Sequence, residues 1–230
     1  MPVESDALGT VTDAATAFQS QPDLATTLAE VVAQAQRCLP EFEHVSVSRH
    51  GSDRRIQTLA ATTETALAFD ALQEETNQGP CLDAATEDDV VTMHDAKHEQ
   101  RWPRYVGRAL DLGLRSQLGV RLRSETKGVL GLNLYSTSHD DIDPGSIGVA
   151  EHFAVHAGIA IGHVREEEQL RTAIGTRTVI GTAVGILMER FGLPRDQAFA
   201  YLVRQSSSAN RKLRVVAREI VDEADHKAGG

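Results

Sequence analysis

Basic side chains are concentrated in the last quarter of the 230-residue sequence. Between Arg171 and Arg218, nine arginines and lysines stand against two acidic residues, for a local charge of +7. Guanidinium groups neutralise phosphates, and amide and hydroxyl groups read exposed bases. The candidates for these two roles are Arg177, Arg204, Arg211 and Lys212 for charge, and Gln205, Ser206 and Asn210 for hydrogen bonding. The stretch therefore indicates an anionic partner, against the alternative of a solvated arginine surface.

The rest of the chain carries the opposite charge. The whole sequence has a formal charge of -10, which by itself argues against a protein that coats nucleic acid or an anionic membrane. Residues 1–164 carry -12, however, and residues 165–230 carry +2. An acidic module is therefore joined to a basic one, and the average conceals the basic one.

Cysteine and histidine are the other candidates for chemistry. Cys81 follows Gly79-Pro80 and is either a redox or chromophore-attachment thiol or a packed interior cysteine, and its apolar context favours the packed one. His94, His98, His152, His156 and His163 are candidate metal or haem ligands, but without a third clustered ligand they read as surface or boundary residues. Because no hydrolase, nucleotide-binding, zinc-protease or kinase signature occurs, we expect no enzyme activity, no catalytic residue and no metal site.

Three amphipathic helices are predicted to position the basic residues. The apolar stripe of the first is Ile180, Ala183, Val184, Leu187, Met188 and Phe191. Gly192 and Pro194 then predict a stop and a restart. A short second helix carries Ala198, Phe199, Leu202 and Val203 and gives way to a polar run from Ser206 to Asn210, and a third helix follows from Leu213. These helices predict a small bundle, with Ser208 or Asn210 as the expected cap of the third helix.

The side of the first helix opposite its apolar stripe is nearly bare of side chains. It holds Thr178, Gly181, Thr182 and Gly185, with Glu189 at its C-terminal end. An interior glycine costs about 1 kcal/mol of helix stability relative to alanine, so two of them four residues apart need a compensating reason. Close approach of another backbone supplies one, and that backbone belongs either to another helix or to a nucleic acid. Thr178, Gly181, Thr182 and Gly185 therefore join the basic and polar candidates in the candidate interface.

The acidic part is predicted to be α+β. Helical spacing covers Leu24 to Leu39 and about Glu64 to Glu75. Alternating residues predict a hairpin of residues 45–48 and 56–59 with a turn at 51–53, a strand at 90–93, and a hairpin of residues 118–122 and 130–134 with a turn at 125–128. Five or six such strands suggest one antiparallel sheet covered by helices on at least one face. Residues 1–22 are expected to be an N-terminal tail.

One helix is predicted without a clear break from about Ile147 to Arg190. Ala150, Phe153, Ala157, Ala160 and Val164 recur at steps of three and four, which is typical of a short coiled-coil seam with small side chains. Two compatible interpretations stay open: these residues form a homodimer seam, or they pack on the chain's own sheet.

The sequence shows no signal for export or for a membrane. Acidic residues precede any apolar stretch at the N-terminus, and the most apolar segment, residues 153–164, is shorter than the roughly 20 residues that span a bilayer. Two cysteines fit a reducing compartment. We expect a cytoplasmic protein without a membrane partner.

The C-terminal residues resemble the ANTAR domain from about Leu170 to Ala224. The resemblance rests on the run from Arg177 to Gly192, followed by Asp196, Ala198-Phe199, Leu202, Ser206, Asn210-Arg211-Lys212-Leu213 and Val216-Ala217. It implies a three-helix RNA-binding module that grips paired stem-loops as a dimer and prevents terminator formation. Val184 stands where many members carry lysine or glutamine, which implies one phosphate contact fewer.

The upstream residues resemble the GAF domains that precede ANTAR modules in actinobacterial regulators, from about Asp23 to Val164. The matching residues are Asn77 to Ala84, Asp95, Arg101-Trp102-Pro103, Gly113 to Ser116 and Gly131 to Ser136. GAF domains hold cyclic nucleotides, tetrapyrroles or haem, or nothing known. The resemblance therefore implies a sensor fold, and a small-molecule ligand in it stays unidentified.

Together these patterns predict a homodimeric regulator in which a GAF-like sensor (residues 23–164) controls an ANTAR-like RNA-binding bundle (residues 165–230). A signal would shift the pairing of the long helix between Ala150 and Val164 and set two bundles at the spacing of two RNA stem-loops. Two alternatives remain: a DNA-binding helical module, and a small-molecule sensor whose helical tail docks a protein partner.

Overall fold

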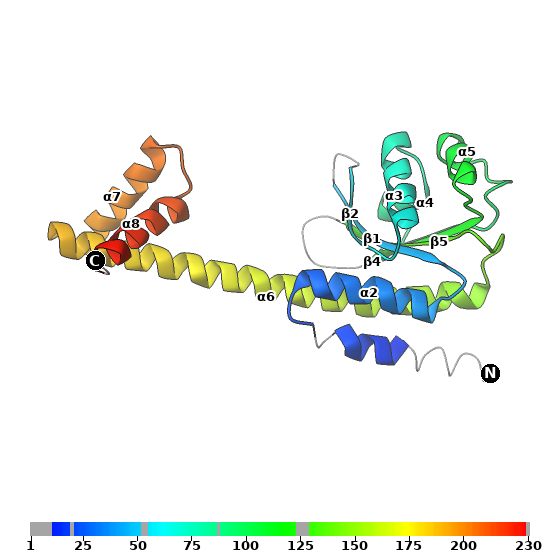
Figure 1. Ribbon diagram of the computed structural model, residues 1–230, viewed down its shortest axis with the longest axis horizontal. Coiled ribbons are helices and arrows are strands. Elements are labelled where there is room, and N and C mark those ends of the chain that lie inside the picture. Colours follow the sequence, from blue (N-terminus) through cyan, green and yellow to red (C-terminus); the bar gives the residue numbers. More distant parts are fainter. Residues whose placement is uncertain (1–10, 19–20, 52–54, 87, 123–128, 229–230) are drawn as a thin grey trace. The chain divides into compact units, whose positions relative to one another are not determined.

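The computed structural model describes residues 11–18, 21–51, 55–86, 88–122 and 129–228 (Figure 1). It consists of two compact units, Met1–Arg165 and Glu166–Gly230. The first combines a sheet with helices and the second is all-helical, which confirms the predicted α+β fold followed by a helical bundle.

The first unit is built on a five-stranded antiparallel sheet with the strand order β2-β1-β5-β4-β3. The strands are β1 (His44–His50), β2 (Ile56–Ala61), β3 (Val90–Met93), β4 (Ser116–Leu122) and β5 (Val129–Ser136). The predicted hairpin partners β1 and β2 pair antiparallel, as do β4 and β5. β1 also pairs with β5, with Val47 opposite Leu132. The turns predicted around residues 52–53 and 125–128 lie outside the described residues.

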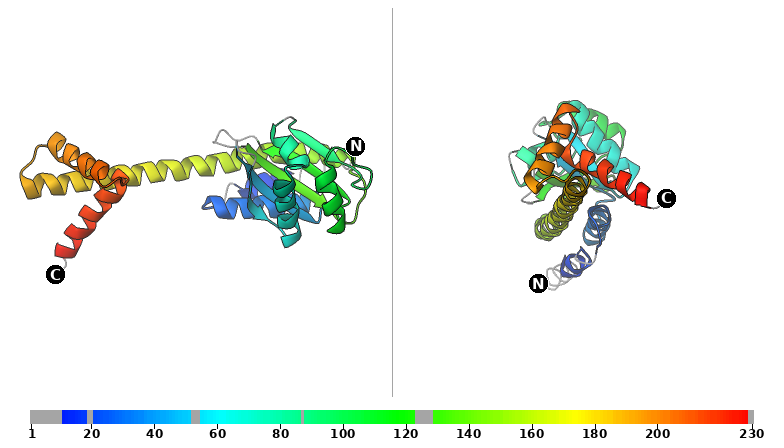
Figure 2. Two further views of the ribbon diagram at one scale, coloured as in Figure 1. Left: turned by 90° about the horizontal axis from the view of Figure 1, so that it is seen from above. Right: turned by 90° about the vertical axis from the view of Figure 1, so that its left-hand side faces the viewer.

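Helices cover both faces of this sheet (Figures 1 and 2). α2 (Leu24–Cys38) and the first part of α6 (Pro144–Phe191) lie side by side on one face, and α3 (Glu64–Thr76), α4 (Pro80–Thr86) and α5 (Pro103–Asp111) lie on the other. The strand alternation sends the aliphatic residues toward α2 and α6, where they form the main core. The sequence patterns did not predict α4 and α5. Each of these helices begins with a proline, which is typical of a loop but also fits the first position of a helix.

The expected dimer seam on α6 is used inside the protomer. Ala150, Phe153 and Ala157 are fully buried in the main core, Ala160 packs against it, and Val164 is buried as well. The ring of Phe153 meets the ring of Phe18 edge to face at a centroid distance of 5.5 Å. These α6 side chains belong to the same core cluster as residues of α2 and of the strands. The burial of Ala150, Phe153 and Ala157 favours the interpretation in which these residues pack on the chain's own sheet, and a dimer seam at the five residues stays a prediction.

Part of the expected N-terminal tail is also packed. Residues 11–18 form a helix, and its Val11, Ala14 and Phe18 are at most 3% exposed. Ala14 and Phe18 belong to the same core as Phe153. The prediction of a tail over residues 1–22 is therefore corrected for residues 11–18, where Val11, Ala14 and Phe18 recur at steps of three and four residues.

The second unit is a bundle of the last part of α6 with α7 (Arg195–Ser208) and α8 (Leu213–Ala228). Its buried core comes from the predicted stripes: Ala183, Val184, Leu187, Ala198, Leu202, Val216 and Ala217. Gly192 has a φ of 63°, a left-handed conformation that ends α6 where the sequence predicted a stop.

The connection from α7 to α8 differs from the prediction. α7 continues through Ser208, and Asn210 follows it with a left-handed φ of 49°. The backbone N–H groups of Asn210 and Arg211 donate to the carbonyl oxygens of Ser207 and Ser206 at 3.2 and 3.0 Å. This arrangement closes the C-terminus of α7. The prediction that Ser208 or Asn210 caps the third helix is therefore wrong, because both residues serve the end of the second.

α6 is the one helix in the described part of the chain that is long and apolar enough to cross a membrane by length and composition. A core helix of a globular protein meets the same two criteria. Phe153, Ala157 and Ile161 are core residues of the first unit, so the apolar character of this part of α6 is explained by packing against the sheet.

Candidate functional site

The side of α6 that the sequence marked as bare is exposed. Thr178, Gly181, Thr182 and Gly185 all face solvent. A Cβ atom added at Gly181 or Gly185 would meet nothing within 4 Å. The hydroxyls of Thr178 and Thr182 donate to the carbonyl oxygens one turn earlier, each at 3.0 Å, and so lie against their own helix. Within the described residues no second helix occupies this side.

The candidate charged residues differ in whether they form an ion pair within the described part of the chain. Arg177 and Arg204 are exposed, and among the described residues neither makes an ion pair. Arg211 instead forms an ion pair with Glu219, with Nη1 donating to Oε2 at 2.8 Å. This hydrogen bond is the main cause that lowers the pKa of the Glu219 carboxyl. Two freely presented guanidinium groups and one partly neutralised group therefore belong to the candidate interface.

The remaining candidates lie at the α7–α8 connection. Gln205, Asn210 and Lys212 are exposed there, whereas the Ser206 hydroxyl donates to the backbone oxygen of Arg211 and thereby holds the connection in shape. In the part of the chain that the structure describes, no hydrogen bond or ion pair joins this group to the bare side of α6. The candidate interface thus has two parts, one on α6 and one at the α7–α8 connection.

Val184 does not lie on either part. It is 6% exposed and belongs to the bundle core. The inference of one phosphate contact fewer is therefore corrected, because the side chain at this position faces the bundle interior rather than a ligand on the bare side.

A second candidate site lies in the first unit, on the face of the sheet beneath α3, α4 and α5. The strand residues that alternate with the aliphatic ones are polar and buried: Ser46, Ser48, His50, Gln117, Asn133 and Tyr135. The Asp70 carboxylate of α3 accepts hydrogen bonds from the Tyr135 hydroxyl, from Asn133 Nδ2 at 3.1 Å and from Thr58 Oγ1 at 2.7 Å. The sequence shows the polar alternation, and its prediction of helices on at least one face of the sheet left open whether this face is covered.

Burial sets the protonation of this cluster. It raises the pKa of the Asp70 carboxyl, against the opposing effect of the hydrogen bonds from Tyr135 and Thr58. It lowers the pKa of His50 to about 4, and it raises the pKa of the Cys81 thiol well above its usual value. His50 is therefore neutral at pH 7 and Cys81 is a thiol, 3.3 Å from His50 Nε2 and 1% exposed, as the packed interpretation expects.

Some hydrogen-bonding capacity in the cluster is unused. His50 Nδ1, Gln117 Nε2 and Asn133 Oδ1 are buried and have no partner among the described residues. A Cβ at Gly131 would lie 3.3 Å from His50 Nε2 and 3.5 Å from Asn133 Oδ1. These contacts show that the cluster is closely packed, and its unpaired buried atoms include both donors and acceptors.

The five histidines singled out in the sequence lie against acidic partners or exposed on α6 in the described part of the chain. The described residues contain no cluster of three or more histidine, cysteine, aspartate or glutamate side chains with metal-binding geometry. His94 and His98 lie against Asp141 and Asp95 at 2.8 and 2.6 Å, and His152, His156 and His163 are exposed on α6.

Comparison with known proteins assigns each unit. Residues 21–162 match the model of the GAF domain, and residues 168–221 match the model of the ANTAR domain. No curated protein matches the sequence.

Solved structures resemble the chain in fold. Bacteriophytochrome RpBphP3 from the photosynthetic bacterium R. palustris has a TM-score of 0.61 at 12% identity, over 86% of this chain and 46% of that chain, so this chain spans less than half of its length. The GAF domain of a phosphoenolpyruvate-protein phosphotransferase from Coxiella burnetii has a TM-score of 0.55 at 14% identity, over 72% and 98%. Free methionine-R-sulfoxide reductase from Neisseria meningitidis, in complex with its substrate, has a TM-score of 0.52 at 13% identity, over 71% and 93%.

The two matched families account for the two units. The GAF match covers more than half of the chain, and the ANTAR match falls on the bundle that carries the bare side of α6. GAF domains sense signals and ANTAR domains bind RNA in antitermination, and neither is a catalytic domain. The chain therefore belongs to the GAF domain family and, with its C-terminal ANTAR domain, is a GAF and ANTAR domain regulator.

Proposed function

We propose that the chain is a signal-responsive regulator that binds paired stem-loops in nascent transcripts and controls transcription termination. The observation that carries this proposal is the exposed, side-chain-poor side of α6, where Gly181 and Gly185 leave open space next to Arg177. An RNA backbone can approach such a surface closely, while Arg177, Arg204 and Lys212 neutralise its phosphates. Gln205 and Asn210 have the groups that hydrogen-bond to bases splayed out of a loop.

A homodimer is part of this proposal, on a different surface from the one first expected. The first unit exposes Val155 and Ile159 on α6, and the second unit exposes Leu170 and Ile174, each at 50% or more. Exposed aliphatic side chains of this size are typical of association surfaces. Two tethered bundles would engage two stem-loops with a raised effective concentration. Sedimentation of a monomer, both with and without RNA, would overturn the dimer.

The remaining features of the proposal follow from the two families. We assign the sensor to residues 23–164 and the RNA-binding domain to residues 165–230, in a cytoplasmic protein that acts by binding rather than by catalysis. The buried polar cluster around Asp70 and Asn133 is the sensor site that we assign, and its unused donors and acceptors favour a small polar ligand.

The deciding experiment compares a two-hairpin RNA with duplex DNA of equal length at fixed salt. We expect the RNA to bind at least tenfold more tightly. Replacing Arg177, Arg204 and Arg211 together with glutamine should weaken RNA binding and make the slope of log K against log salt shallower by about 2.1 to 2.7, since each lost phosphate contact removes roughly 0.7 to 0.9. Arg195→Gln, an exposed charge outside the proposed interface, is the control.

Two outcomes would support the alternatives. Equal or tighter binding of the duplex DNA would favour a DNA-binding module. A triple variant that keeps its regulatory effect in cells would favour a helical tail that docks a protein partner.

Replacing Gly181 or Gly185 with alanine should stabilise the bundle but weaken RNA binding. We expect Gly181→Ala and Gly185→Ala each to raise the free energy of unfolding of the bundle by about 1 kcal/mol, because the added methyl group has room and alanine is the better helix former. The same methyl groups should weaken RNA binding by holding the backbone away. Thermal unfolding and RNA titration check the two effects.

Gly148→Ala is the matched control, since this glycine also lies in α6 with open space around it but in the first unit. It should leave RNA affinity unchanged. Glycine variants of the bundle that keep full RNA affinity would show that the RNA does not lie against this side of α6.

A further inference from the structure

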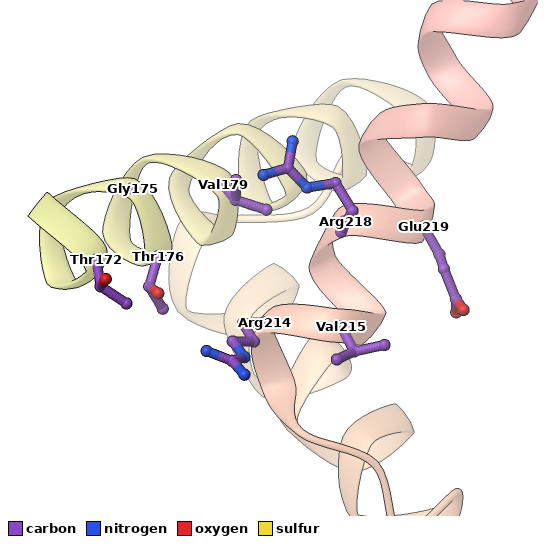
Figure 3. A pocket seen from close by; sticks show the side chains of 8 residues that line it. All are labelled: Thr172, Gly175, Thr176, Val179, Arg214, Val215, Arg218 and Glu219. Carbon is purple, nitrogen blue, oxygen red and sulfur yellow. The ribbon is translucent and has the colours of Figure 1, made fainter. Parts of the chain in front are cut away.

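The second unit contains a groove of about 550 Å³ between α6 and α8 (Figure 3). α6 contributes Thr172, Gly175 and Thr176 to its wall, and α8 contributes Arg214 and Arg218. None of these residues belongs to the candidate interface described above. The groove is a separate surface of the same bundle.

The charge of the groove is positive. Arg214 and Arg218 lie one turn apart on α8, both are exposed, and neither makes an ion pair among the described residues. Glu219 also borders the groove, but its carboxylate is held by Arg211, with one contact at 2.8 Å, and in Figure 3 it points away from the two guanidinium groups. The first turn of α8 contains no acidic residue. Two uncompensated guanidinium groups therefore face the groove.

The α6 side of the groove, opposite the arginines, has few bulky side chains and carries hydroxyl groups that can form hydrogen bonds. Gly175 has no side chain, and a Cβ added there would meet nothing within 4 Å. Thr172 and Thr176 flank it with hydroxyl groups, as Figure 3 shows. Val179 and Val215 complete the lining with apolar surface. A strand can thus enter without displacing a side chain from α6.

We propose that this groove binds the phosphodiester backbone of the RNA, as a second contact in addition to the bare side of α6. Arginine guanidinium groups bind phosphates through paired N–H donors, and two of them one turn apart suit successive phosphates of a strand. The volume lies within the range of small-ligand sites and exceeds the need of a single ion. The inference rests on the proposed RNA-binding function and extends its footprint to α8.

Removal of both arginines tests the groove. Binding of the two-hairpin RNA by the full chain is measured from 50 to 300 mM salt for wild type and for Arg214→Gln/Arg218→Gln. We expect the slope of log K against log salt to become shallower by about 1.4 to 1.8, and affinity at physiological salt to fall on the order of tenfold or more. Arg195→Gln should leave the slope of log K against log salt at the wild-type value within about 0.3, which is roughly the precision of the measurement.

A second variant places a negative charge in the groove without a steric conflict. Gly175→Glu adds a side chain where there is open space, in a residue type that suits a helix, and it should weaken RNA binding at least as much as the loss of one arginine. Gln197→Glu on α7 adds the same charge to an exposed position outside the groove and should change affinity less than twofold. Thermal unfolding verifies that all variants are folded.

The outcomes separate this inference from the proposed function. If wild type binds the RNA better than duplex DNA while the groove variants keep its affinity and slope, the groove inference fails alone; if wild type shows no such preference, both fail. Titration of wild type with adenosine monophosphate in the absence of RNA should show no binding, and micromolar binding lost in the double variant would instead make the groove a nucleotide site. A changed sedimentation coefficient of the RNA-free variants would make it a contact between copies of the chain.

Discussion

Phe153→Ala is expected to lower the free energy of unfolding of the first unit by about 3–5 kcal/mol. The Phe153 ring is fully buried between α2, the sheet and the helix of residues 11–18, and it meets Phe18 edge to face at 5.5 Å. Truncation removes the whole ring and leaves a cavity that the surrounding aliphatic residues cannot fill without strain. Urea unfolding followed by circular dichroism, with the sensor transition resolved from that of the bundle, measures the loss.

Val155→Ala is the matched control for this variant. Val155 lies two residues away on the same helix and is 50% exposed, so we expect a change within about 0.5 kcal/mol. The two variants also distinguish a role of Phe153 in the internal core from a role in a dimer seam. If Phe153→Ala left unfolding unchanged but dissociated a dimer, Phe153 would act between protomers, and the packing described here would not govern its role.

The difference between Phe153 and Val155 shows what helical periodicity can predict. The spacing of Ala150, Phe153 and Ala157 indicates that this side of α6 is buried, and it is. The spacing contains no information on the partner that buries it, because the same small side chains suit a second helix and a sheet equally. Only the position of α6 against α2 and the strands decides between a homodimer seam and an internal core.

Strand alternation has a similar limit. Val45 and Val47 alternate with Ser46 and Ser48, which predicts a strand with one apolar face, and β1 confirms it. The alternation leaves open whether the serine face is covered as well. The serines are buried because α3 packs on β1 and β2, and α4 packs on β3, β4 and β5. The polar cluster could therefore be seen in the residues but not located in the fold.

The sequence alone marks residues of the candidate interface but not those of the groove, for a physical reason. Gly181 and Gly185 are anomalous on their own helix, so a sequence without a structure already marks them. Gly175 and the two arginines of the groove are anomalous only together, since an exposed arginine on α8 and a glycine on α6 are ordinary residues separately. Sites formed across two helices require the packing of those helices to be known.

Asp70→Ala is expected to destabilise the first unit by roughly 2–6 kcal/mol, since each buried donor left without its acceptor costs about 1–3 kcal/mol. The substitution removes the acceptor of the hydroxyls of Tyr135 and Thr58. Asn133 Nδ2 loses the same acceptor but keeps Ser46 and Ser48, at 3.2 and 2.9 Å, so it contributes less. Urea unfolding at pH 7 measures the effect.

Asp70→Asn isolates the charge from the hydrogen bonds, because the amide keeps the size of the side chain and one acceptor oxygen. Burial raises the pKa of Asp70 in the folded protein above the value of about 3.9 in an unfolded chain. The folded state then holds the proton more tightly than the unfolded state. The contribution of Asp70 to stability is fully present below about pH 4 and is lost as the pH rises through the folded pKa. Wild type should therefore lose stability relative to Asp70→Asn across that window, and the difference should level off above it.

An exposed carboxylate gives the opposite sign and serves as the control. The pKa of Glu75 is lowered, mainly by its hydrogen bond with Arg108, so its contribution is present above its unfolded pKa and is lost as the pH falls. Wild type should thus lose stability relative to Glu75→Gln on acidification, by a small amount because the pair is exposed. Unfolding curves between about pH 2.5 and pH 8 for both variants cover the two windows and decide the matter. A difference between wild type and Asp70→Asn that does not change with pH would mean that the hydrogen bonds to the Asp70 carboxylate offset its burial, and that the cluster carries a full negative charge on the sensor side of the sheet.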